Sequence, residues 1–208
     1  MKLEDVRHRL AKHPEKQYKR RPLTSIKQIA IHHSGTREGD AFSFARYHVH
    51  ENDWPGIGYH YVILKDGTIQ WTNDLEVISY HVQNHNPSAV GICLVGDFRK
   101  EIINTNQKDS LRSLCEFLLV KLSLSPLNIL GHNELLQGKT ECPALNMNEL
   151  RQYLTQNYVE IYLENKKMDV SGIIKEGITF VALRPFAEQL GYQVFWDGEK
   201  RRIYLTKK

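Results

Sequence analysis

The chain has 208 residues, of which 41% are hydrophobic and 25% charged, and its formal net charge is +4. This length can bury a medium-sized domain and leaves room for a small second one. The composition is that of an ordinary globular protein, and no apolar run is long enough to predict a membrane-spanning segment. Three widely separated cysteines, an odd number, argue against a disulfide framework.

The positive charge is concentrated in a basic N-terminal arm, residues 1–25, with eight Lys or Arg against three Asp or Glu. Such an arm could touch an anionic polymer, or it could simply wrap the domain, and the sequence leaves both interpretations open. We predict no nucleic-acid partner. The charged start lacks the apolar region of a secretory signal peptide, so we expect the protein to be made in the cytoplasm.

Strands and helices alternate over the first 158 residues, which predicts an α/β domain with a mixed central β-sheet flanked by helices. The hydrophobic pattern predicts, in chain order, a buried strand at 27–32, a helix at 41–50, a hairpin of 59–64 with 68–71, a central strand at 89–96, a helix from a Thr105 cap to 122, a strand at 128–130 and a helix at 147–158.

The pattern changes at residue 159. We predict a strand at 159–163, a turn at 165–167, a strand at 178–181, a helix at 184–191 and a hairpin of 193–198 with 202–205. Residues 159–208 therefore form a small α+β C-terminal domain. The absence of a low-complexity linker predicts that the two domains lie close together.

Two imidazoles and one thiol stand at the ends of predicted elements: His32 ends a strand, His132 follows another, and Cys142 precedes a proline. Such residues form a natural zinc site with an open fourth position. Because the three residues are far apart in the sequence, they could equally be two histidines at the ends of elements and a buried cysteine with no metal. The residues alone leave both the zinc site and this structural interpretation open. Because neighbouring side chains of a strand point to opposite faces, only one of His32 and His33 can easily reach a given atom.

Four motifs in one order resemble the zinc-dependent N-acetylmuramoyl-L-alanine amidase family, which includes phage lysozymes and peptidoglycan recognition proteins. They are Ile-His-His-Ser at 31–34, Gly-Tyr-His-Tyr at 58–61, Asn-Pro-Ser-Ala-Val-Gly-Ile at 86–92 with Val-Gly-Asp at 95–97, and Gly-His at 131–132 with Thr-Glu-Cys-Pro at 140–143. The resemblance covers about residues 20–158 and implies that residues 1–158 are the catalytic domain.

The resemblance implies that Zn2+ is held by His32, His132 and Cys142, with Tyr59 and Thr140 assisting. The implied reaction is hydrolysis of the amide between N-acetylmuramic acid and L-alanine in bacterial peptidoglycan, by a water that zinc activates. Tyr59 could donate to the oxyanion or orient the water, and Thr140 could bond the water or the intermediate. No general base is assigned.

Other polar residues carry two interpretations each. His81 could contact substrate or be a satisfied structural histidine, and Asn86 could contact substrate or shape a turn. Trp54 could line a sugar-binding groove or plug a hydrophobic gap. His60 points away from Tyr59 and is expected to pack, while Lys139 could take over part of the role of its neighbour Thr140.

Residues 180–187, 190–192 and 194–197 resemble the small stalk-type domain named after the N-terminal domain of copper amine oxidases, which implies binding to the cell wall or a partner. The chain as a whole is expected to be a phage or prophage endolysin of Gram-positive bacteria, released to the wall through a membrane lesion. Two rivals are a binding module without hydrolytic activity and a thiol hydrolase using Cys142 with His132. The sequence does not predict the oligomeric state.

Overall fold

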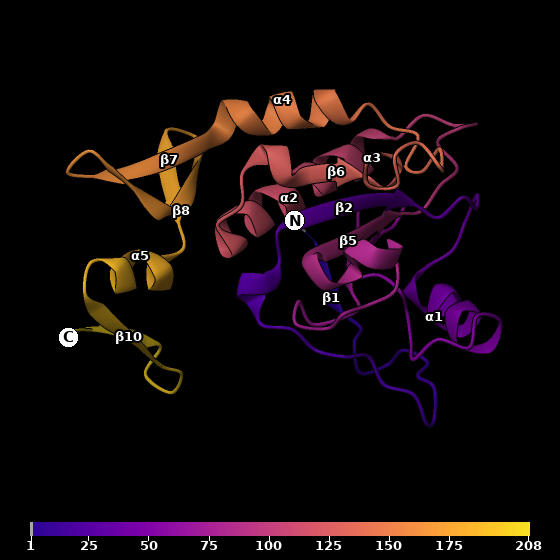
Figure 1. Ribbon diagram of the computed structural model, residues 1–208, viewed down its shortest axis with the longest axis horizontal. Helices are drawn as coiled ribbons and strands as arrows, with labels where there is room; N and C mark the ends of the chain where they lie inside the picture. The colour runs from indigo at the N-terminus through magenta and orange to yellow at the C-terminus, as the bar shows by residue number, and fades with distance from the viewer. Residues whose placement is uncertain (1) are drawn as a thin grey trace.

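A six-stranded sheet with the strand order β1-β4-β3-β5-β2-β6 forms the centre of the larger unit (Figure 1). The computed structural model describes residues 2–208. The strands are β1 (Leu3–Asp5), β2 (Gln28–His33), β3 (Tyr61–Ile63), β4 (Ile69–Trp71), β5 (Ala89–Leu94) and β6 (Ile129–Gly131). Of the helices described, none has the length and apolarity needed to cross a membrane.

Parallel and antiparallel pairs both occur in this sheet, which confirms the predicted mixed architecture. Strand β2 runs parallel to β5 and β6, β3 runs parallel to β5 and antiparallel to β4, and β1 runs parallel to β4. Strand β5 lies in the middle with every residue buried, as its continuous apolar sequence predicts. Because β2 and β6 are parallel neighbours, their carboxyl ends meet at one edge of the sheet.

Helices cover the sheet: α1 (Ala41–His50), α2 (Thr105–Leu122), α3 (His132–Leu135) and α4 (Met147–Asn157), with short 3-10 helices η1 (Leu23–Ser25), η2 (Gln83–Ser88) and η3 (Pro126–Asn128). The leucine stripe of α2 is buried against the sheet in the main hydrophobic core. The predicted cap of α2 is off by one residue: Asn104 is the N-cap, its side chain accepting from the Gln107 amide, and Thr105 is the first helical residue.

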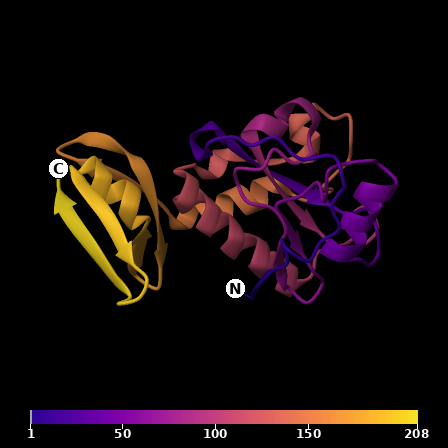
Figure 2. The ribbon, with the colours of Figure 1, turned by 90° about the horizontal axis from the view of Figure 1, so that it is seen from below.

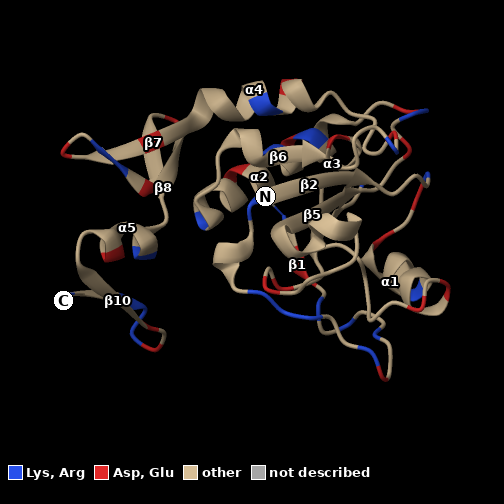
Figure 3. Ribbon diagram, viewed as in Figure 1, with Lys and Arg blue, Asp and Glu red and all other residues tan. Residues whose placement is uncertain are grey.

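The basic N-terminal arm crosses the surface of the larger unit. Its first residues form β1, and Val6 and Leu10 are buried. Arg7 and Arg20 both pair with Asp74, so part of the arm's charge is neutralised within the molecule. Figure 3 shows Lys and Arg along much of the arm and Asp or Glu at only a few places on it. The structure therefore favours the wrapping interpretation over a free basic surface.

The smaller unit forms a lobe beside the larger one (Figure 2). It contains a three-stranded antiparallel sheet of β7 (Tyr158–Leu163), β8 (Lys166–Lys175) and β9 (Ile178–Val181), then α5 (Leu183–Gln189) and a hairpin of β10 (Tyr192–Asp197) and β11 (Arg202–Lys207). The predicted turn at 165–167 is wrong. The turn lies at Glu164 and Asn165, both with positive φ, and Lys166 already begins the long strand β8.

Strand β8 joins the two lobes by packing on α2. Met168, Val170 and Ile173 are buried, and the Ser171 hydroxyl is 3.5 Å from the Leu119 carbonyl of α2. Lys175 pairs with Glu116 of the same helix at 2.9 Å. No separate linker segment intervenes, because β7 follows α4 directly.

Candidate metal centre

His32, His132 and Cys142 converge at the edge of the sheet where β2 and β6 end. His32 lies near the end of β2, His132 begins α3 directly after β6, and Cys142 belongs to the loop between α3 and α4. One potential ligand atom from each residue lies within 4.8 Å of the others. The Sγ atom of Cys142 is 3.8 Å from Nδ1 of His32, and the two imidazole centroids are 4.6 Å apart.

Burial keeps all three donors uncharged when no cation is present. Desolvation lowers the pKa of His32 well below its usual value, with smaller contributions from His132 and His33, and burial also lowers the pKa of His132. Burial raises the pKa of Cys142 to about 11. The imidazoles therefore offer lone pairs at neutral pH, whereas the thiol becomes a ligand only when a cation displaces its proton.

The chemistry of this donor set fits zinc. Two imidazole nitrogens and a thiolate suit a borderline-soft cation, and three protein ligands leave a fourth tetrahedral position open. The cluster contains no carboxylate. Calcium and magnesium, which prefer oxygen ligands, are therefore poor candidates.

Backbone contacts hold the Cys142 sulfur in place. The backbone N–H of His33 donates to Sγ over 3.4 Å, and the Asn133 N–H donates to the Cys142 carbonyl over 2.6 Å. The Cys142 N–H in turn donates to Thr140 Oγ1 over 3.2 Å. Donation to sulfur favours the thiolate, so these contacts prepare Cys142 for a metal.

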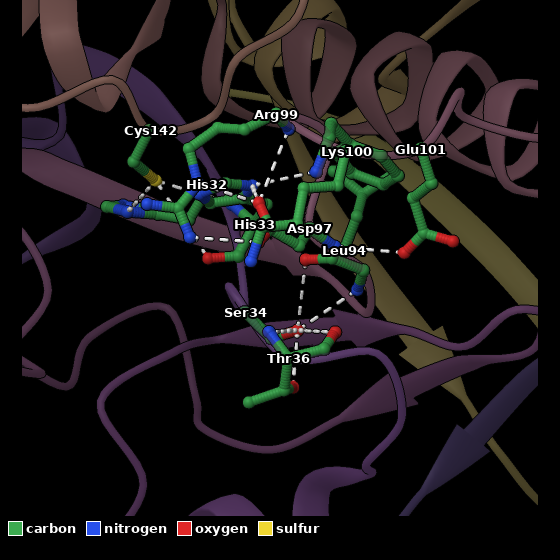
Figure 4. Close-up of polar contacts among 12 residues, drawn as sticks. His32, His33, Ser34, Thr36, Leu94, Asp97, Arg99, Lys100, Glu101 and Cys142 are labelled. Atoms are coloured by element: carbon green, nitrogen blue, oxygen red, sulfur yellow. Dashed lines mark hydrogen bonds and ion pairs between the residues drawn. The ribbon is translucent and has the colours of Figure 1, made fainter.

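The side chain of His33 lies away from this cluster. Its Nδ1 accepts from the backbone N–H of Phe98 over 3.2 Å, in a buried position. Beside it, Asp97 holds the Arg99 guanidinium in a two-pronged pair with distances of 2.7 and 2.9 Å (Figure 4). The two adjacent histidines thus face different surroundings, as strand alternation requires.

Tyr59 and Thr140 line a cleft of about 380 Å³ together with the three candidate ligands. The Tyr59 ring centroid is 5.4 Å from that of His32. Burial raises the pKa of Tyr59 well above its usual value, so its hydroxyl keeps a proton to donate. Thr140 accepts from the Cys142 N–H and retains its own hydroxyl proton for a ligand in the cleft.

The neighbours of Thr140 are placed differently. Lys139 and Glu141 both have exposed side chains. Of these three consecutive residues, Thr140 is the one that lines the cleft.

Aromatic side chains form one wall of the cleft. Trp54 stacks on His48 with ring centroids 4.9 Å apart, and Tyr80 meets Trp54 edge-on at 5.8 Å. Tyr80 and Arg99, which were not among the predicted site residues, also line the cleft. Two sequence features could have identified them: Arg99 lies two residues after the Val-Gly-Asp motif, and Tyr80 directly precedes His81.

His81 and Asn86 interact mainly with the protein itself. His81 Nδ1 lies 3.0 Å from Nε2 of His32, although one part of the ring borders the cleft. Asn86 Oδ1 accepts from the backbone N–H groups of His81 and Val82 over 3.0 and 2.8 Å, which shapes the turn leading into η2. A direct contact of Asn86 with substrate stays a prediction.

His60 is fully buried with its tautomer fixed. The Gly91 N–H donates to Nδ1 over 3.0 Å, so the proton resides on Nε2, which donates to the Val77 carbonyl over 2.9 Å. The remaining cysteines, Cys93 and Cys115, are buried in the core. His60, Cys93 and Cys115 are therefore buried residues of the fold, and none of them lines the cleft.

Family comparisons agree with this geometry. Residues 22–145 match the family described as N-acetylmuramoyl-L-alanine amidase, and residues 139–206 match the copper amine oxidase N-terminal domain. The first match spans the five strands from β2 to β6 and every candidate ligand, while the second begins in the Cys142 loop and runs through the smaller lobe.

Individual relatives extend the comparison. The endolysin of Escherichia phage T7 is 30% identical over 139 residues, 63% of this chain and 87% of its own length. Peptidoglycan-recognition protein LB of Drosophila melanogaster is 35% identical over 99 residues, 47% of this chain but only 42% of its own length. The structure of the N-acetylmuramoyl-L-alanine amidase LysC from Clostridium intestinale URNW superposes with a TM-score of 0.61 at 25% identity, covering 74% of this chain and 97% of LysC.

Proposed function

The chain belongs to the N-acetylmuramoyl-L-alanine amidase family, and from that premise we propose that it is a zinc-dependent endolysin that hydrolyses the amide between N-acetylmuramic acid and L-alanine in peptidoglycan. The observation that carries the proposal is the convergence of His32, His132 and Cys142 within 4.8 Å in a cleft that Tyr59 and Thr140 also line. A bound zinc supplies Lewis-acid polarisation of the scissile carbonyl and lowers the pKa of water.

The chain's own residues complete the chemistry. Attack on the amide carbonyl creates an oxyanion, and we propose that Tyr59, which lines the cleft and keeps its hydroxyl proton, donates to it. The Thr140 hydroxyl, oriented by the Cys142 N–H, donates to the attacking water or to the intermediate. The faces of Trp54 and Tyr80 offer a surface on which a sugar ring can lie.

The thiol-hydrolase rival is less compatible with this geometry. A cysteine nucleophile must be a thiolate, yet burial raises the pKa of Cys142 to about 11. A chelator should therefore abolish activity, and added zinc should restore it. Inactivation by an alkylating agent with no effect of the chelator would instead support the thiol mechanism.

Mass spectrometry of digested peptidoglycan tests the reaction. We expect free L-alanine amino termini and intact glycan strands; new reducing sugars would contradict the amidase, and binding without products would support the non-hydrolytic rival. Cys142→Ser should lose both zinc and product, whereas Cys115→Ala, which changes a buried cysteine of α2, should retain both. Unchanged lysis by Cys142→Ser would refute the metal assignment.

We propose residues 159–208 as a separate functional unit that binds the cell wall or a wall-associated partner. The hairpin supports this role, because the cross-strand aromatic pair Phe195 and Tyr204 remains exposed, by 65% and 42%, and Arg202 lies on the same face of β11 as Tyr204. In a Cys142→Ser background, sedimentation with purified Gram-positive walls should fall when Phe195 becomes Ser. A matched change of Gln193, which lies on the same face of β10, should have little effect.

Endolysin function also implies that the protein reaches the wall after release from the cell. We propose that it depends on a separate membrane lesion, which agrees with the endolysin relatives. Expression inside a Gram-positive host should leave cells intact until the membrane is permeabilised. Lysis without permeabilisation would contradict this dependence.

A further inference from the structure

The imidazole of His32 makes contacts at both of its nitrogens. Nδ1 faces the Cys142 sulfur at 3.8 Å and belongs to the candidate ligand cluster. Nε2 lies 3.0 Å from Nδ1 of His81, and the two rings are nearly perpendicular, at 88°. An imidazole that binds a metal through one nitrogen is oriented by whatever accepts from the other.

Proton counting decides the direction of the hydrogen bond between the two rings. A neutral imidazole has one N–H and one lone pair. If Nδ1 of His32 gives its lone pair to a metal, Nε2 carries the proton and must donate to His81 Nδ1. His81 then carries its own proton on Nε2, a buried nitrogen with no hydrogen-bond partner within residues 2–208.

The position of His81 is built by other parts of the fold. The Asn86 side chain accepts from the His81 and Val82 N–H groups, and Arg21 donates to the Asn86 carbonyl over 2.5 Å. Gly91 on β5 leaves room for the imidazole: a Cβ there would lie 2.8 to 2.9 Å from three atoms of the His81 ring. The His81 side chain therefore occupies a fitted slot next to His32.

We propose that His81 is a positioning residue that accepts the Nε2–H of His32 and thereby holds the tautomer whose Nδ1 lone pair faces the metal. The proposal rests on the zinc function proposed above and assigns His81 to the metal centre rather than to substrate. Neither ring needs to become charged for this role, because the hydrogen bond joins two neutral imidazoles.

Two variants of His81 distinguish its role as a hydrogen-bond acceptor from its contribution to packing. His81→Asn places a side-chain oxygen near the former Nδ1 and can still accept, whereas His81→Leu has similar bulk and no acceptor. Zinc affinity, measured by competition with a chromophoric chelator, should fall roughly 10- to 100-fold in the leucine variant. The asparagine variant should stay within a few-fold of the parent protein.

Gly91→Ala provides an independent perturbation, since its new Cβ displaces the His81 ring without changing His81. It should also weaken zinc binding while His32 and Cys142 remain unchanged. Wild-type zinc affinity in both His81→Leu and Gly91→Ala would overturn the proposal, as would equal losses in His81→Leu and His81→Asn.

Nitrogen NMR of the zinc-loaded parent protein tests the proton placement without any variant, so a folding defect cannot obscure the result. We expect the His32 proton on Nε2, the His81 proton on Nε2 and a bare His81 Nδ1. A proton on His81 Nδ1 would refute the proposal. If the parent protein bound no zinc at all, the proposed function itself would fail; if it bound zinc and cut peptidoglycan with a different tautomer, only the role of His81 would fail.

Discussion

Replacing His32 and His33 separately by alanine tests how the two adjacent histidines divide their roles. His32→Ala removes an imidazole donor from the cluster, so bound zinc and amidase activity should both be lost. His33→Ala leaves all three donors, and it also leaves the backbone N–H that donates to the Cys142 sulfur. This second variant should therefore retain zinc.

The expected cost of His33→Ala is in stability. The backbone N–H of Phe98 loses its acceptor, His33 Nδ1, at a buried position. An unsatisfied buried donor costs about 1–3 kcal/mol. For a chain of this size, a loss of 2 kcal/mol lowers the melting temperature by roughly 4–8 °C.

Zinc content by metal analysis and melting temperature by circular dichroism distinguish the two effects. His33→Asn is the matched control, because its side-chain oxygen can replace Nδ1 as the acceptor and should recover part of the lost stability. Equal zinc loss in His32→Ala and His33→Ala would refute the assignment of His32 as the ligand.

Three further predictions follow from the cleft and its surroundings. Tyr59→Phe should bind zinc normally but lower kcat by roughly 10²- to 10³-fold, the cost of removing one oxyanion donor; an unchanged kcat would contradict the donor role. Arg99→Ala should raise KM for wall fragments with free stem-peptide carboxylates, because Arg99 lines the cleft, whereas Lys100→Ala, with a mostly exposed side chain, should not. Burial lowers the pKa of His48 from 6.5 to about 4, so the unfolded state binds its proton first as pH falls. Stability should therefore be lost between pH 6.5 and 4, by about 1.4 kcal/mol per unit, and His48→Asn should flatten that loss in chemical denaturation.

Hydrophobic periodicity was enough to predict most of the elements in the correct order. Continuous apolar runs identified β2 and β5, and the leucine stripe identified α2, because these segments bury one face or both. Strand β8 was not predicted, because its sequence has charged residues at both ends, contains Gly172, and does not alternate regularly between apolar and polar residues. Its burial comes from packing on α2, a contact that no local pattern contains.

The parallel pairing of β2 with β6 brings the candidate ligands together in space. The sequence could identify these residues, but it could not show that they lie close to one another. His32 and His132 are 100 residues apart, and they meet because His32 lies at the end of β2 and His132 directly follows β6, the parallel neighbour of β2. Cys142 arrives from a loop whose path depends on contacts such as the Asn133 N–H to its carbonyl. Family motifs supplied the grouping that spacing alone could not.

The two histidines contribute to the centre through different chemical groups. His32 contributes a ring nitrogen, so its identity matters to the metal, whereas His33 contributes a backbone N–H to the Cys142 sulfur, which any residue except proline could supply. The His33 ring instead accepts from Phe98 on the loop that carries Asp97 and Arg99. Sequence periodicity can show that two neighbouring side chains diverge, but it cannot show that the second residue still reaches the site through its backbone.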